Sequence, residues 1–161
     1  MTVAVQPRVF MRVALVDRAE PEAGATRAPT DDDIVSLGAL MSSAYFDTID
    51  DEGETPEQAA EEVRKTFEGG YGQFDPQCSA LIEKNGRILS AALITRFQGR
   101  PFVAFSMTDP AVKRQGLSRA CLCASMVALR RRGESELRLV VTLANTAAVD
   151  LYSSLGFKMD R

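Results

Sequence analysis

Residues 109–133 read DPAVKRQGLSRACLCASMVALRRRG, and this stretch decides the fold. It predicts a helix that begins just after Gly116. Lys113, Arg114 and Arg119 surround that glycine, although the dipole of a helix favours negative charge at its N-terminus. A bound anion would account for the arrangement, because free backbone N–H groups at a helix start hold phosphate and a glycine lets the backbone come close.

The same stretch also has a plainer interpretation. On this view the basic residues are solvated and flank an amphipathic helix, since apolar residues recur with the helical period. The stretch holds neither the Gly-Lys-Ser/Thr of the Walker phosphate loop nor the three glycines of a dinucleotide fingerprint. Taken alone, it leaves both interpretations open. The apolar positions are Leu117, Ala120, Cys121, Ala124, Val127 and Leu129.

Strands are predicted on both sides of this helix. Two apolar runs flank Asn85-Gly86, the strongest short-range signal for a two-residue hairpin. A third strand follows over Phe102–Thr108. After the helix, the β-branched run at 137–143 predicts a buried strand, and a short helix is expected over Thr146–Ser154.

The N-terminal half adds a strand and two helices. Val9–Val16 reads as a strand, and a helix is expected from the N-cap Thr30 to Phe46, followed by one from Pro56 to Phe67. Three hairpin-linked strands before a strand-helix-strand unit predict an α+β fold, with a mixed central β-sheet and helices on both faces. The length of 161 residues fits one domain.

Composition excludes several classes of function. A formal charge of −3 argues against nucleic-acid binding, and the absence of histidine excludes a Ser-His-Asp triad, a Cys-His pair and imidazole metal ligation. Three cysteines, an odd number, favour a reducing compartment. The N-terminal sequence lacks the features of a signal peptide and no apolar run has the length of a membrane span, so a cytoplasmic location without membrane contact is expected.

Two motifs resemble those of the GCN5-related N-acetyltransferase (GNAT) family. KRQGLS at 113–118 resembles the family's Gln/Arg-x-x-Gly-x-Gly/Ala acyl-CoA signature, and Asp109-Pro110 lies where that family often has an acidic residue and proline. LVVTLANTAAVDLYSSLGF at 139–157 resembles its second signature. Lys113 and Ser118 depart mildly from the first pattern, and both departures bear on affinity for the cofactor.

The resemblance implies a three-layer GNAT-like fold and one acetyltransferase domain over 1–161. Residues 1–77 would shape the acceptor side and 78–157 would form the acyl-CoA-binding core. The implied reaction uses acetyl-CoA as cosubstrate and needs no metal. In it, a primary amine of a small molecule or a peptide attacks acetyl-CoA directly. The implied cofactor contacts are Met107, Thr108, Lys113, Arg114, Gln115, Gly116, Leu117, Ser118, Arg119 and Asn145, with a backbone N–H near Met107 for the thioester carbonyl.

The resemblance also implies that the Tyr152 phenol protonates the departing thiolate; the alternative is a tyrosine that packs at a helix end. Asn145 is either a cofactor contact, a helix cap, or both. The sequence does not assign the general base that deprotonates the amine. The candidates are water, Glu83, Asp109 and an acid of the 47–62 segment. The alternative for the acids of that segment is that they form a solvated face. A non-catalytic acyl-CoA-binding module on the same fold is the alternative function.

The end of the sequence carries a further expectation. Only Lys158–Arg161 follow Phe157, which is too short for the closing two-strand hairpin that this family commonly has. We therefore expect the preceding sheet edge to be open, and open edges favour pairing with another chain. A homodimer, formed through that edge or the N-terminal segment, is predicted.

Overall fold

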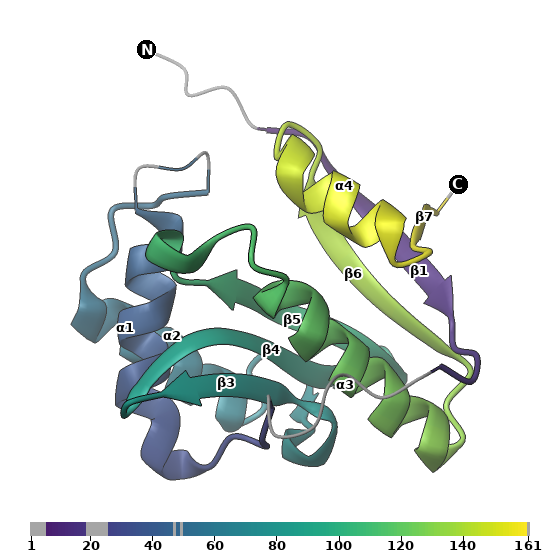
Figure 1. Cartoon of the computed structure of the whole chain (residues 1–161), viewed down its shortest axis with the longest axis horizontal. Helices are drawn as coiled ribbons and strands as arrows, with labels where there is room; N and C mark the ends of the chain where they lie inside the picture. The colour runs from purple at the N-terminus through teal and green to yellow at the C-terminus, as the bar shows by residue number, and fades with distance from the viewer. Residues whose placement is uncertain (1–5, 19–25, 47, 49, 161) are drawn as a thin grey trace.

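A computed structural model describes residues 6–18, 26–46, 48 and 50–160 of the chain. They form a mixed seven-stranded sheet covered by helices on both faces, which confirms the predicted fold class. Figure 1 shows α3 and α4 on one face, and α1 and α2 on the other. The elements are β1 (Arg8–Ala14), α1 (Ile34–Tyr45), α2 (Pro56–Phe67), β2 (Gln73–Phe74), β3 (Ala80–Lys84), β4 (Arg87–Phe97), β5 (Arg100–Thr108), α3 (Leu117–Arg132), β6 (Glu136–Thr142), α4 (Thr146–Ser154) and β7 (Lys158–Met159), with 3-10 turns at Asp31–Asp33, Pro76–Cys78 and Pro110–Val112.

Local sequence signals explain where these elements begin and end. In α2, the Thr55 hydroxyl accepts from the Gln58 N–H at 3.1 Å, the Gln58 side chain accepts from the Thr55 N–H at 2.9 Å, and Pro56 opens the helix. In the β3–β4 turn, Asn85 and Gly86 have φ of 55° and 76°, as a tight hairpin requires. The predicted bounds of α2 and α4 are confirmed to the residue.

Two hydrophobic cores, one on each face, hold the layers together. The core under α1 and α2 includes Leu37, Met41 and Leu93, and the core under α3 and α4 includes Met11 and Leu139. Each face of the sheet therefore buries its own set of side chains, since successive residues of a strand point to opposite faces.

The strand order is β2-β4-β5-β6-β1-β7, and β3 also pairs with β4. β5 and β6 run parallel and pair at Phe102 and Arg138, near the start of both strands. Beyond that pair they diverge toward Thr108 and Thr142 (Figure 1). The sheet thus opens between its two central strands.

The N-terminal strand lies far from the helix pair that follows it in sequence. β1 pairs antiparallel with β6 over its whole length, from Arg8 with Thr142 to Ala14 with Glu136, and with β7 on its other side. The expectation of an open edge beside β6 is therefore wrong, because the N-terminal strand covers that edge. Dimerisation itself stays a prediction, which light scattering at high protein concentration tests.

Candidate active site

The separation of β5 from β6 forms a cavity of about 450 Å³. β5 carries one extra residue, Ala104, where its pairing with β4 shifts between Leu93 and Ile94, and such bulges bend a strand. The bulge lies in the wall of the cavity. The lining includes Phe102, Val103, Ala104, Phe105 and Ser106 of β5, Leu139, Val140, Val141 and Thr142 of β6, and Arg8, Met41, Tyr45, Asp50, Glu52, Glu54, Glu62, Tyr71, Asn145, Ala148 and Tyr152.

The turn before α3 exposes backbone N–H groups. Arg114 and Gly116 have φ of 64° and 78°, and Gly116 is the N-cap residue. The first N–H to bond within the helix is that of Ala120, which donates to the Gly116 carbonyl at 3.0 Å. The N–H groups of residues 117–119 are consequently without intrahelical acceptors, as at any helix start. Lys113, Arg114 and Gln115 are exposed around them.

Ser118 and Thr108, two of the predicted cofactor residues, connect this turn to β5 by a hydrogen bond. The Ser118 and Thr108 hydroxyls share a hydrogen bond, and the Thr108 hydroxyl also bonds the Ser90 hydroxyl at 2.8 Å. Leu117 packs against the core under α3, and the Arg119 guanidinium donates to the Ser154 hydroxyl of α4 at 2.8 Å. The turn therefore has a fixed place at the end of β5 while its N–H groups stay free.

Met107 is fully buried in the core under α1 and does not line the cavity, whereas its neighbour Ser106 does. Its carbonyl accepts from the Ser90 hydroxyl at 3.0 Å. The cavity-facing part of β5 is thus the Phe102–Ser106 segment.

Asn145 caps α4. Its side-chain oxygen accepts from the Ala148 N–H at 3.2 Å, and its nitrogen faces the Asp50 carboxylate at 3.5 Å. The cap role considered for this residue is therefore present, and the side chain also lines the cavity.

Tyr152 lines the cavity from α4, with its ring edge-on to Phe157 at 5.8 Å. Burial raises the pKa of the Tyr152 phenol, and the charge of Asp50 adds to this, whereas a hydrogen bond with Ser106 lowers it. The net increase keeps the phenol protonated at neutral pH, as a proton donor must be.

Sequence reasoning did not single out Tyr45, which ends α1 and lines the same cavity. Burial is the main cause that raises the pKa of this phenol. The charges of Tyr152, Asp50 and Glu54 raise it further. Its apolar helix gives no signal of a site, since only the fold brings the end of α1 beside α4.

Acids of the 47–62 segment line the cavity, whereas the other two candidate bases lie elsewhere. The lining acids are Asp50, Glu52, Glu54 and Glu62, and Asp47 lies outside the described residues. Burial raises the pKa of Glu54, and the neighbouring charges of Glu52 and Glu62 raise it further. Glu83 pairs with Arg27 at 3.0 Å and Asp109 pairs with Arg87, and neither lines the cavity.

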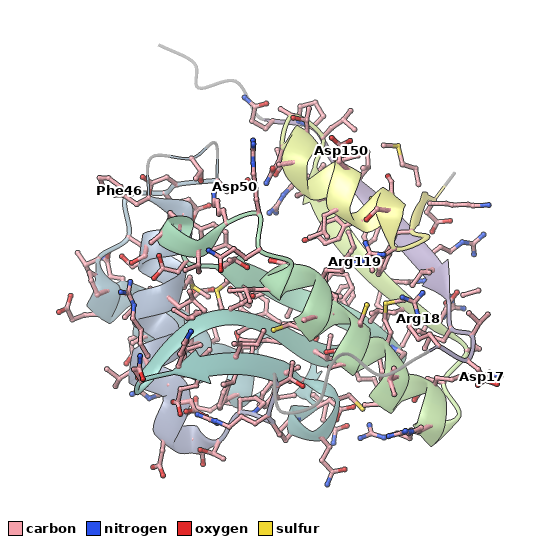
Figure 2. All side chains as sticks on the ribbon, viewed as in Figure 1. Asp17, Arg18, Phe46, Asp50, Arg119 and Asp150 are labelled. Carbon is pink, nitrogen blue, oxygen red and sulfur yellow. The ribbon has the colours of Figure 1, made fainter. Side chains whose placement is uncertain are left out.

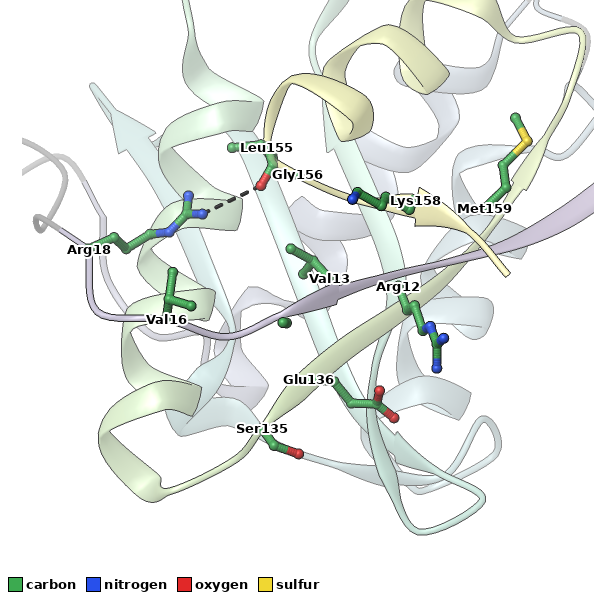
Figure 3. Close-up of a pocket in the computed structure, with 11 residues that line it drawn as sticks. Arg12, Val13, Val16, Arg18, Ser135, Glu136, Leu155, Gly156, Lys158 and Met159 are labelled. Carbon is green, nitrogen blue, oxygen red and sulfur yellow. Dashed lines mark hydrogen bonds between the residues drawn. The ribbon is translucent and has the colours of Figure 1, made fainter. Parts of the chain in front are cut away.

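A second cavity, of about 790 Å³, lies at the outer edge of β1 and beside the turn after α4 (Figure 3). Arg12, Arg18 and Lys158 border it, and the Arg18 guanidinium donates to the Leu155 carbonyl at 3.4 Å. Its lining includes none of the three tyrosines of the first cavity.

Within the described ranges, no group of three or more histidine, cysteine, aspartate or glutamate residues could hold a metal ion. Among those same residues, no helix has both the length and the apolar character needed to cross a membrane.

Comparison with known proteins identifies relatives of this chain. The sequence profile of the Acetyltransferase (GNAT) family matches residues 41–157. A curated relative, the ribosomal protein bS18-alanine N-acetyltransferase of Escherichia coli, is 33% identical over 93 residues. That match covers 58% of this chain and 62% of the relative's length.

Two solved structures share the fold. A GCN5-related N-acetyltransferase from Sphaerobacter thermophilus superposes with a TM-score of 0.73 at 19% identity, over 95% of this chain and 48% of that one. An aminoglycoside N-acetyltransferase in complex with CoA superposes with a TM-score of 0.65 at 13% identity, over 87% of this chain and 93% of that one.

Proposed function

The chain belongs to the GNAT acetyltransferase family, and from that premise we propose that it transfers the acetyl group of acetyl-CoA to a primary amine by direct attack. The observation that carries the proposal is the cavity between β5 and β6. It brings the phenol of Tyr152 and the carboxylate of Glu54, an acid and a base, to one space beside the Phe102–Ser106 part of β5, the strand that ends at Thr108 before the Gly116 turn.

The exposed turn supports the binding of acetyl-CoA. The free N–H groups of residues 117–119 fit a diphosphate, and Lys113 and Arg114 add positive charge beside them. The pantetheine arm of acetyl-CoA, if it runs from this turn along β5, reaches the cavity at Ser106. A backbone N–H near Met107 stays the predicted donor to the thioester carbonyl. The CoA complex of the aminoglycoside N-acetyltransferase with this fold supports the same cosubstrate.

The residues of the cavity match the proton transfers of the reaction. A lysine-like amine has a pKa of about 10 and a peptide α-amine one of about 8, so both are mostly protonated near neutral pH. Glu54, with its raised pKa, accepts the ammonium proton, the free nitrogen attacks the thioester carbon, a C–N bond forms and the C–S bond breaks. Tyr152 donates a proton to the leaving thiolate, and the second proton of the amine nitrogen, lost as the amide forms, restores the phenol.

The acceptor class follows from the charge of the cavity. Four carboxylates and Arg8 line it, so its field favours a cationic amine over an anion such as nucleic acid. The name of the Escherichia coli relative specifies the alanine of a ribosomal protein, which supports a protein or peptide amine alongside small amines. We also propose a cytoplasmic location, which the free state of the three cysteines supports.

Turnover tests the proposal. Release of free thiol from acetyl-CoA is measured with a panel of amines: a polyamine, an amino acid, an aminoglycoside and an alanine-initiated peptide, with the acetylated product identified by mass spectrometry. We expect thiol release that depends on an amine. Binding of acetyl-CoA without thiol release for any amine would instead support the non-catalytic module.

A further inference from the structure

Asp50 connects two parts of the molecule that are distant in sequence. It lies between α1 and α2, yet its carboxylate accepts from the Thr142 hydroxyl at the end of β6 at 2.8 Å and faces the Asn145 amide nitrogen at 3.5 Å. Figure 2 shows Asp50 where the α1 side of the molecule meets β6 and α4. The carboxylate therefore links the connection between α1 and α2 to the end of β6 and to the N-cap of α4.

The contact with Asn145 reaches the helix that carries the acid. The Asn145 side-chain oxygen caps α4 through the Ala148 N–H, so its nitrogen is left for Asp50. Asn145, Ala148 and Tyr152 all line the cavity, and their spacing of three and four residues places them on one face of α4. A contact that holds Asn145 in place therefore also holds the start of α4, the helix that carries Tyr152.

The charge of Asp50 also acts on two phenols of the cavity, those of Tyr152 and Tyr45. Burial is the main cause of the raised pKa of Tyr152 and of Tyr45, and Asp50 raises both further. The other charged groups that line the cavity are Arg8 of β1 and Glu52, Glu54 and Glu62.

We propose that Asp50 is a positioning residue, which fastens the acceptor-side segment between α1 and α2 to the helix that carries Tyr152. The inference rests on the proposed acetyl transfer. Its physical basis is that the amine, held by the acceptor side, and the acid, held by α4, must meet the same thioester. A displacement of about 1 Å at such a site costs about 100-fold in rate.

A double-mutant cycle tests the link. Asp50→Ala is expected to lower kcat by about 10- to 100-fold with little change in acetyl-CoA affinity. Thr142→Val removes one of the two contacts and is expected to lower kcat less. The double variant should match Asp50→Ala to within roughly twofold, because both changes break one link. Glu57→Ala, an exposed acid of α2 that does not line the cavity, is the control and should keep the parent kcat.

The pH profile separates positioning from a merely structural role. Tyr152 must be protonated to act, so kcat falls as pH rises through its pKa. Asp50→Asn removes a negative charge that raises this pKa. The fall of kcat at alkaline pH, the alkaline limb of the profile, should therefore move to lower pH. Loss of stability alone would leave the limb in place.

The outcomes are distinguishable. An active parent enzyme with unchanged kcat in Asp50→Ala, or with additive losses in the double variant, overturns the positioning role and leaves the proposed function intact. A parent protein that binds acetyl-CoA but acetylates no amine overturns both.

Discussion

At the scale of single residues, the proposed chemistry depends most on the hydroxyl of Tyr152. Tyr152→Phe keeps the ring and its contact with Phe157 but removes the proton donor. We expect kcat to fall by about 10² to 10⁴, the usual contribution of a positioned acid, with acetyl-CoA affinity unchanged by calorimetry. Tyr71→Phe, in the same cavity, should lower kcat much less. Near-parent turnover in Tyr152→Phe would mean that the phenol only packs.

A second residue-scale prediction concerns Glu54. The negative charge of Glu52 and a hydrogen bond with it both raise the Glu54 pKa. A carboxylate acts as a base only when ionised, so kcat should rise with pH through this raised pKa. Glu52→Gln removes the neighbouring charge and should therefore lower the Glu54 pKa. The rise of kcat with pH, the acid limb of the profile, should then move to lower pH. An unmoved limb would argue for water as the base.

At the scale of elements, the two ends of α3 offer a matched pair of substitutions. Gly116 and Gly133 flank the helix with φ of 78° and 96°, and no atom lies within 4 Å of a Cβ built on either. A valine at either position is therefore strained by backbone conformation, at about 1–2 kcal/mol, and not by a clash. Both variants should lose similar stability in thermal unfolding.

Only Gly116 belongs to the proposed diphosphate turn. Gly116→Val should therefore weaken CoA binding in calorimetry, whereas Gly133→Val should leave the dissociation constant near that of the parent. Equal CoA affinity in the two folded variants would place the diphosphate elsewhere.

At the scale of the whole molecule, the N-terminal strand pairs with strands that are distant from it in sequence. β1 lies between β6 and β7, and the Asp160 N–H donates to the Phe10 carbonyl at 2.9 Å. The start of β1 and the end of β7 are therefore antiparallel neighbours. Antiparallel neighbours of this kind can be joined by a short turn.

A circular permutant tests this topology. The chain is opened between Arg18 and Arg27, and residues 8–18 are fused after Asp160 through a short linker. The permutant should show the parent's circular dichroism and kcat, because β1 keeps its neighbours. Deletion of residues 1–14 should instead destabilise the protein, since it removes Met11 and Val13 from the core. A permutant that fails to fold would show that the order of the chain, and not only its contacts, is required.

The sequence by itself determined the local elements and the family. A capping box and a proline fix the start of α2, Asn85-Gly86 fixes the hairpin, and a left-handed glycine fixes the start of α3. Each of these signals acts within a few residues, so each can be read without knowledge of the fold. The two GNAT motifs, at 113–118 and 139–157, are likewise continuous in sequence.

Only the tertiary structure decided which distant residues meet. The alternation of apolar residues in a strand predicts which of its faces is buried, but not which strand it pairs with. No local signal therefore predicts that β1 lies beside β6 and not beside the helices that follow it in sequence. Nothing local joined Asp50 to Thr142, 92 residues apart, or brought Tyr45 to Tyr152. These contacts form because two cores on opposite faces of one sheet pack at once, and that packing is a property of the whole chain.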